Sequence, residues 1–149
     1  MSDDHAAMIN ARRGGFNESL GLIFARATVD EVVATITLGA QHHQPYGVVH
    51  GGVYASMIET VASVGAALNV MPDGKHTVGL ENSTTFLRAT REGTLTATGT
   101  PLTRGRRSHV WEVAITDDDG RLVAKGRVRM LVLENDAHLA GETVTLKAP

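Results

Sequence analysis

Glu59 is the single charged residue in an otherwise apolar segment, Val53–Leu68. The segment contains no proline and several alanines, which predicts an α-helix. Because its other positions are apolar nearly all round, it is typical of a core helix. A carboxylate is costly to bury unless something pairs with it or uses it, and such groups cluster at functional sites. Glu59 is therefore the first candidate for a nucleophile or general base.

Three hydroxyl side chains accompany Glu59 on the predicted helix. Ser56, Glu59, Thr60 and Ser63 fall at positions i, i+3, i+4 and i+7, which places them on one helix face. Ser63 lies one turn beyond Glu59, where it could hold the carboxylate or a water molecule. The alternative is that this polar stripe faces solvent and Glu59 is an ordinary surface residue.

The tripeptide His50-Gly51-Gly52 directly precedes the predicted helix. The first turn of a helix presents free backbone N–H groups and the positive end of the helix dipole. Glycines there let a ligand approach the backbone closely, so the site can stabilise a developing oxyanion. The alternative is a flexible loop that ends at a helix cap.

The spacing of Gly51 and Glu59 adds a constraint. Eight residues of helix span about 12 Å along the axis. One reacting carbonyl cannot lie ~3 Å from both groups, so they must act from different chains if they act together. The sequence therefore predicts a homodimer with composite sites.

The segments before and after the predicted helix have strand patterns, and these strands must hold the helix in place. Alternating, threonine-rich or β-branched segments predict strands, which lie at Val32–Leu38, Thr77–Thr90, Thr94–Thr103, His109–Thr116 and Leu122–Leu133. Asp117–Gly120 predicts a hairpin turn and Gly39–Gly52 a loop. One helix and a meander of strands indicate an α+β fold. The sheet must curl around the helix, because only that helix is available to cover its apolar face.

The ends of the chain carry weaker signals. A short helix is expected at Ala6–Arg13, within residues 1–19, with a frayed terminus as the alternative. Residues 135–149 are expected to be a weakly structured tail. No repeat or linker interrupts the sequence, so residues 1–149 are expected to form a single domain.

Composition narrows the function classes. The chain has 149 residues, a net charge of −2 and no cysteine, which excludes disulfides and thiolate chemistry. Its charge gives no broad attraction to nucleic acid or to an anionic membrane. The start, Met1–His5, lacks the regions of a signal peptide, and no apolar run approaches the ~20 residues of a membrane span. We expect a soluble cytoplasmic protein.

The segment 43–52, followed by Glu59 and Ser63, resembles the hotdog-fold acyl-CoA thioesterases of the PaaI-like group. The likeness is greatest to the Arthrobacter-type 4-hydroxybenzoyl-CoA thioesterase and the 1,4-dihydroxy-2-naphthoyl-CoA hydrolases, and it spans roughly Leu20–Leu133. It also includes Val78–Glu81, Phe86–Arg88, Arg91–Gly93, Pro101–Arg106 and Val110-Trp111. The resemblance implies one long central helix wrapped by a curved antiparallel sheet. It also implies hydrolysis of an acyl-CoA, and it favours an aromatic acyl group.

The resemblance also implies roles for residues of this chain. Glu59 would be the nucleophile or general base, and the Gly51 N–H would polarise the thioester oxygen. Gln44 and His50 would orient the acyl group or lend support, and Ser63 would place the water or the carboxylate. The positions that match CoA-binding residues are Phe86, Arg88, Thr103, Arg104, Gly105, Arg106, Arg107 and Ser108. Tyr54, Met57 and Ile58 are expected to line the acyl pocket.

The resemblance further implies an assembly of at least a dimer, commonly a tetramer made of two dimers. CoA enters as part of the substrate, so no cofactor is expected. Arg104, Arg106 and Arg107 surround a glycine turn, where guanidinium groups can pair with the CoA phosphates. The alternative is a solvated hairpin tip.

Other chemistries fit less well. The chain has seven histidines, but His42 and His43 are adjacent and cannot point the same way on an extended chain. His50, His76 and His109 lack metal-ligand spacing, so no metal site is expected. There is neither a Gly-x-Ser-x-Gly motif nor a Gly-rich phosphate loop. A non-catalytic acyl-CoA binding module stays open as an alternative. A hydratase of the same fold would be expected to pair its acid with a catalytic histidine.

Overall fold

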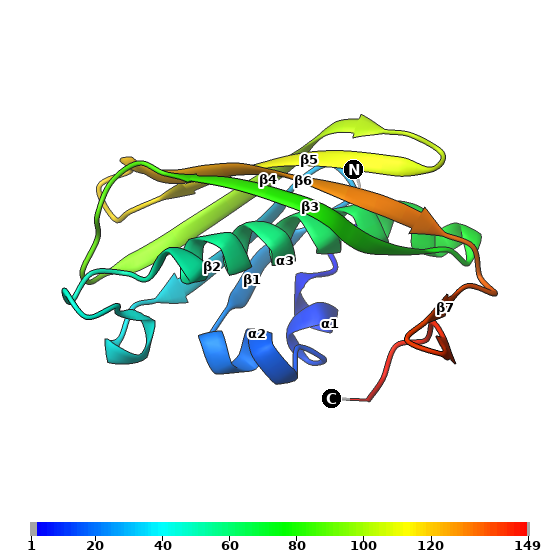
Figure 1. The fold of residues 1–149 in the computed structure, drawn as a ribbon, viewed down its shortest axis with the longest axis horizontal. Helices are drawn as coiled ribbons and strands as arrows, with labels where there is room; N and C mark the ends of the chain where they lie inside the picture. Colours follow the sequence, from blue (N-terminus) through cyan, green and yellow to red (C-terminus); the bar gives the residue numbers. More distant parts are fainter. Residues whose placement is uncertain (1–2, 149) are drawn as a thin grey trace.

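The computed structural model describes residues 3–148. One long helix, α3 (Gly51–Val70), lies against the concave face of a six-stranded antiparallel sheet that curves around it (Figure 1). This confirms the predicted α+β class and the arrangement expected of a hotdog fold.

The sheet has the strand order β1-β2-β4-β5-β6-β3, and every neighbouring pair is antiparallel. Its strands are β1 (Ile23–Ala27), β2 (Val32–Thr37), β3 (His76–Phe86), β4 (Thr94–Arg104), β5 (Ser108–Thr116) and β6 (Leu122–Leu133). β6 has the predicted bounds, whereas β3 ends four residues before the predicted Thr90. β3 is an edge strand, so one row of its backbone groups has no partner strand within the described chain.

The core lies between the sheet and one face of α3. Every second residue of β5, from His109 to Ile115, is buried. Trp111 is fully buried and packs against Gly65 of α3, where a side chain would collide with the indole. The α3 residues buried on this face include Tyr54, Met57, Ile58, Val61, Ala62 and Ala66. Burial of each large apolar side chain contributes about 1.5–3 kcal/mol, so this contact fixes the helix on the sheet.

Helix α3 is longer than the predicted Val53–Leu68 by two residues at each end. His50 is its N-cap, and His50 Nδ1 accepts a hydrogen bond from the Gly52 amide at 2.8 Å. The segment Gly51–Asp73 is long and apolar enough to cross a membrane by length and composition, which corrects the expectation that no apolar run approaches that length. Half of its most apolar 18-residue stretch is buried inside the protein, and core helices pass the same test of length and composition.

The remaining elements flank this body. They are α1 (Ala6–Asn10), α2 (Gly15–Leu20), the 3-10 turns η1 (Ala40–His42) and η2 (Met71–Asp73), and the short strands β7 (His138–Leu139) and β8 (Glu142–Thr143). α1 is shorter than the predicted Ala6–Arg13, and Gly15 begins a second short helix, α2, which the sequence did not predict. α1 is not frayed, because the Asn10 side chain exchanges two hydrogen bonds with the Phe24 backbone. The tail forms a small hairpin. Met1, Ser2 and Pro149 lie outside the described residues.

Candidate active site

The Glu59 side chain points from α3 toward the edge strand β3. Its Oε2 accepts a hydrogen bond from Asn82 Nδ2 at 3.0 Å, and the same amide donates to the Ala55 carbonyl at 3.1 Å. Its Oε1 lies where a side chain on Gly79 would be. β3 has a bulge between Gly79 and Glu81 at this point. Glu59 is half-buried within one chain, so it is neither sunk in the core nor free in solvent.

The hydroxyl groups near Glu59 have separate partners. Ser56 Oγ donates to the Gly52 carbonyl at 2.6 Å, and Thr60 Oγ1 donates to Asn17 Oδ1 at 2.9 Å. Ser63 Oγ lies 4.0 Å from Met130 Sδ, which is a weak acceptor. Ser63 therefore keeps most of its hydrogen-bonding capacity for a ligand or a water molecule.

Gly51 is the first residue of α3, as its predicted role requires, and the Phe86 ring lies against it. A Cβ on Gly51 would be 2.7 Å from Phe86 Cζ. Beside them is a hollow of about 380 Å³. The residues lining it are Gln44, Val48, Val49, Gly51, Tyr54, Phe86, Leu87, Arg88 and Ala89. The fold therefore brings five of the predicted site residues together here, from both the catalytic and the substrate-binding sets.

Tyr54 and Phe86 form the aromatic part of this hollow. Their ring centroids are 6.0 Å apart and the rings are tilted by 36°. Burial raises the pKa of the Tyr54 hydroxyl, so it is a neutral phenol at ordinary pH. Met57 is fully buried in the core and does not line the hollow.

The histidines near this hollow serve the local backbone. His42 is buried, accepts from the Gly39 amide at 2.9 Å and lies 2.7 Å from the Leu20 carbonyl through Nε2. His43 Nε2 lies 2.6 Å from the Arg91 carbonyl. Within residues 3–148, no group of three or more His, Cys, Asp or Glu side chains could hold a metal ion.

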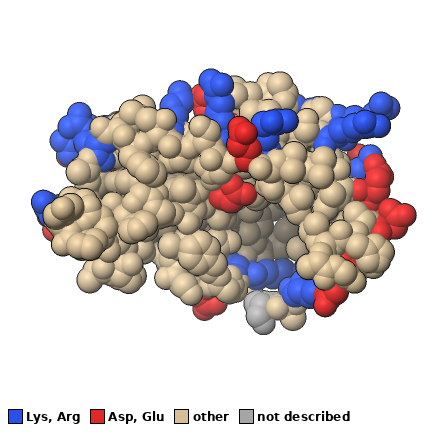
Figure 2. Space-filling view, in the orientation of Figure 1, with Lys and Arg blue, Asp and Glu red and all other residues tan. Residues whose placement is uncertain are grey.

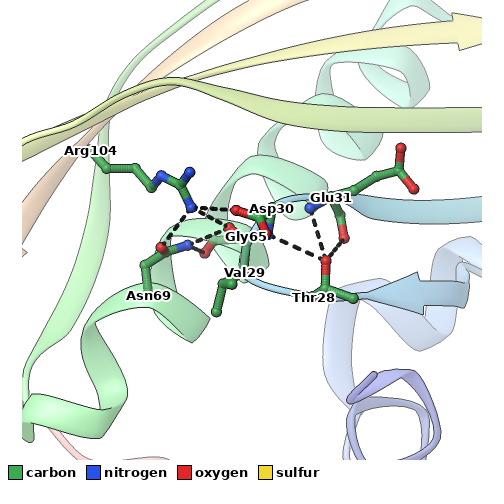
Figure 3. A network of polar contacts seen from close by, with 7 residues as sticks. All are labelled: Thr28, Val29, Asp30, Glu31, Gly65, Asn69 and Arg104. Atoms are coloured by element: carbon green, nitrogen blue, oxygen red, sulfur yellow. Dashed lines mark hydrogen bonds and ion pairs between the residues drawn. The ribbon is translucent and has the colours of Figure 1, made fainter. Parts of the chain in front are cut away.

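The predicted arginine cluster lies at the other end of α3. Arg104 Nη1 donates to the Val29 carbonyl at 3.1 Å, to Asp30 Oδ1 at 2.8 Å and to Asn69 Oδ1 at 3.2 Å (Figure 3). The Asn69 amide in turn donates to the carbonyls of Val29 and Gly65, each at 2.8 Å. Arg104 thus ties the β1–β2 turn to α3 and is largely committed to the fold.

A second hollow, of about 400 Å³, lies beside this network. It is lined by Asn69, Val70, Asp73, Lys75, Arg104, Gly105, Arg106, His109 and Val132. Lys75 forms an ion pair with Glu134 at 3.3 Å. On the face seen in Figure 2, many Lys and Arg side chains gather along the sheet side of the molecule, others lie at the lower edge, and Asp or Glu side chains lie near the centre.

The predicted site residues therefore form three groups along α3. The Gly51 hollow is at its start, Glu59 and Ser63 are in its middle, and the arginine hollow is at its end. A helix of 20 residues spans about 30 Å. A single chain does not bring the three groups to one point.

Comparison with known proteins identifies the family. The family model described as "Thioesterase superfamily" matches residues 46–124, which include Gly51, Glu59 and the arginine turn. The chain belongs to the thioesterase superfamily. It is a thioester hydrolase, and the resemblance drawn from its sequence is confirmed.

Three relatives illustrate the family. The Mycobacterium tuberculosis protein Rv1847 is 44% identical over 121 residues, which cover 80% of this chain and 86% of the relative. Its solved structure matches with a TM-score of 0.78 and 43% identity, and the match covers 80% of this chain and 96% of that one. The proofreading thioesterase EntH of Cronobacter sakazakii is 35% identical over 120 residues (80% and 87%). The 1,4-dihydroxy-2-naphthoyl-CoA hydrolase of Listeria monocytogenes is 32% identical over 118 residues (79% and 95%).

The structure adds two residues to the Glu59 site that the sequence interpretation missed. Asn82 and Gly79 both belong to β3, which is separated from α3 and Glu59 by the turn η2. No local pattern in the sequence reports such a contact. Two signals pointed to Gly79: its place inside an otherwise strand-like segment, which is typical of a bulge or a close approach, and its place in Val78–Glu81, a segment that resembles the thioesterases.

Proposed function

We propose that the protein hydrolyses an acyl-CoA, with an aromatic acyl group, to the free acid and CoA. Glu59 acts as nucleophile or general base, and the Gly51 N–H polarises the thioester carbonyl. The observation that carries the proposal is the setting of Glu59, whose carboxylate is half-buried beside the open strand β3 and oriented by Asn82. The relative named as an acyl-CoA hydrolase supports CoA as the thiol.

The chemistry follows from these two groups. The Gly51 amide at the positive end of α3 favours negative charge on the carbonyl oxygen. A Glu59 oxygen attacks the carbonyl carbon, the C–S bond breaks, CoA leaves as a thiolate, and water then hydrolyses the anhydride to acid and carboxylate. In the general-base route, Glu59 instead takes a proton from the water that attacks.

Two protomers supply these groups in the proposal. Glu59 and Gly51 of one chain are about 12 Å apart along α3, too far for one carbonyl. The edge strand β3 carries the exposed side chains of Leu80 and Phe86, and exposed Leu87 directly follows it. One row of its backbone groups has no partner strand within residues 3–148. Such an edge is a ready surface for a second strand. We therefore propose a homodimer through β3, assembled further into a tetramer, in the cytoplasm.

The substrate fits two features of the surface. The Tyr54 and Phe86 rings give the Gly51 hollow an aromatic lining for the acyl group. The turn that carries Arg106 and Arg107, with Lys75 nearby, offers cations for the phosphates of CoA. Arg104 contributes less to this in the proposal, because Asp30 already pairs with it. His50, Ser63 and Gln44 keep the supporting roles that the resemblance implies.

Thiol release from benzoyl-CoA and from aliphatic acyl-CoAs tests the proposal. Glu59→Ala and Glu59→Gln should abolish turnover while CoA affinity is retained, and Glu81→Gln, which removes an exposed carboxylate from β3, should be unaffected. Near-normal turnover in Glu59→Gln contradicts the assignment. Binding of acyl-CoA by the unaltered protein without thiol release would favour the non-catalytic module. Sedimentation analysis tests the dimer.

A further inference from the structure

His109 is a buried side chain that the proposed mechanism does not use. It lies at the start of β5, is 3% exposed, and its Nδ1 has no hydrogen-bond partner among residues 3–148. A buried polar atom without a partner costs free energy, and an apolar side chain at this inward position would avoid that cost. The presence of an imidazole here therefore calls for a reason other than packing.

The surroundings of His109 point to that reason. His109 pairs with Arg104 across β4 and β5 and lines the hollow that also contains Lys75, Arg106 and Asp73. The turn above it is tight, because the Gly105 amide donates to the Ser108 carbonyl at 2.9 Å. A Cβ on Gly105 would itself be 2.9 Å from the Ser108 carbonyl oxygen. His109 therefore lies next to the base of the arginine turn and lines the same hollow as Gly105 and Arg106.

The charge state of the imidazole matters for its neighbours. Burial lowers the pKa of His109, the Arg104 guanidinium lowers it further, and a hydrogen bond to the Gly105 backbone acts in the opposite direction. A neutral imidazole can donate to that backbone without pairing with the arginines. A carboxylate at this position would pair with the arginines, and an aliphatic side chain could not donate a hydrogen bond to the turn.

We propose that His109 is a positioning residue for the CoA-binding turn. The uncharged ring supports Gly105 from below and holds the turn in the shape that presents Arg106 and Arg107 to the phosphate groups of the substrate. This inference rests on the proposed function, because the turn has this role only if the substrate is a CoA thioester. His109 touches neither the acyl group nor the reacting atoms in this scheme.

Two thioesters of the same benzoyl group separate positioning from general structural damage. Benzoyl-CoA carries the phosphates, and benzoyl-N-acetylcysteamine lacks them. In His109→Leu we expect KM for benzoyl-CoA to rise roughly fivefold, the scale of one neutral hydrogen bond. We expect kcat for benzoyl-CoA, and kcat/KM for the short thioester, to stay unchanged. His109→Gln keeps a donor and should recover most of the lost affinity.

CoA affinity, measured by calorimetry in the same proteins, gives a readout that does not depend on turnover. A matching loss of CoA affinity in His109→Leu, restored in His109→Gln, supports the inference. Equal losses with both thioesters, or unchanged CoA affinity in His109→Leu, overturn it. If the unaltered protein hydrolyses neither thioester, the proposed function fails, and the calorimetric comparison still decides whether His109 positions the turn.

Discussion

A single side-chain amide joins Glu59 to the strand opposite it. Asn82 Nδ2 donates both to Glu59 Oε2 and to the Ala55 carbonyl one turn earlier on α3, at 3.0 and 3.1 Å. Thr84 Oγ1 donates to Asn82 Oδ1 at 2.6 Å, so it fixes which end of the amide faces the carboxylate. The edge strand therefore sets the orientation of the candidate catalytic group, although that group belongs to the helix.

Replacing Asn82 with alanine should lower kcat for an acyl-CoA by about 10- to 100-fold. A hydrogen bond to a charged acceptor contributes roughly 1.5–3 kcal/mol, and each 1.4 kcal/mol corresponds to a factor of ten. Steady-state thiol release measures the effect. Thr84→Val should give a smaller loss of the same kind, because it only frees the amide to rotate. Ser83→Ala, at the intervening position of β3, is the control. An unchanged kcat in Asn82→Ala would show that Glu59 needs no orientation.

Gly79→Ala should reduce activity by about 100-fold, the scale expected when a catalytic group is displaced by about 1 Å. The new methyl group would overlap Glu59 Oε1 and push the carboxylate away. Gly79 has no positive φ, so the substitution adds no backbone strain of that kind. The prediction is that activity falls while the melting temperature changes little. A parallel fall of both would indicate that the strand, not the carboxylate, had been disturbed.

The sequence predicts those site residues that stand out from their neighbours in the chain. Glu59 stands out because it interrupts an apolar helix, and the bounds of β6 follow from its composition and the turn before it. Asn82 and Gly79 were missed because they reach Glu59 only after β3 has packed against α3. The short helix α2 was missed because glycine at its start reads as a breaker, whereas Gly15 there adopts a φ of +62°.

The arginine turn is a second case in which the sequence pattern did not predict a tertiary contact. The spacing of Arg104, Arg106 and Arg107 predicts three equivalent cations. The fold assigns Arg104 to Asp30 and Asn69, which lie on other elements far from it in the sequence. Tertiary contacts therefore give Arg104 a structural role that its sequence neighbours Arg106 and Arg107 do not share.

Gly51→Ala should reduce activity, and the double variant with Phe86→Ala should show the cause. In the single variant the new Cβ would lie 2.7 Å from Phe86 Cζ, so the exposed ring must move. If steric overlap alone is responsible, removal of the ring restores kcat to the level of Phe86→Ala, and the effects of the two substitutions are not additive. If the added methyl blocks approach to the Gly51 amide itself, the double variant stays inactive. Comparison of kcat across the three variants distinguishes the two causes.

The lowered pKa of His109 predicts a specific dependence of folding stability on pH. An unfolded histidine titrates near pH 6.5, and the folded His109 titrates below its usual value because it is buried and faces Arg104. Between these two pKa values the unfolded chain binds more protons, so the contribution of His109 to stability is lost as pH falls below about 6.5. In His109→Gln this contribution is absent, and the other six histidines are the same in both proteins. Urea unfolding at pH 7.5 and 5.5 should therefore show His109→Gln gaining stability relative to the unaltered protein at the lower pH. An identical difference between the two proteins at both pH values would mean that His109 titrates normally in the folded state.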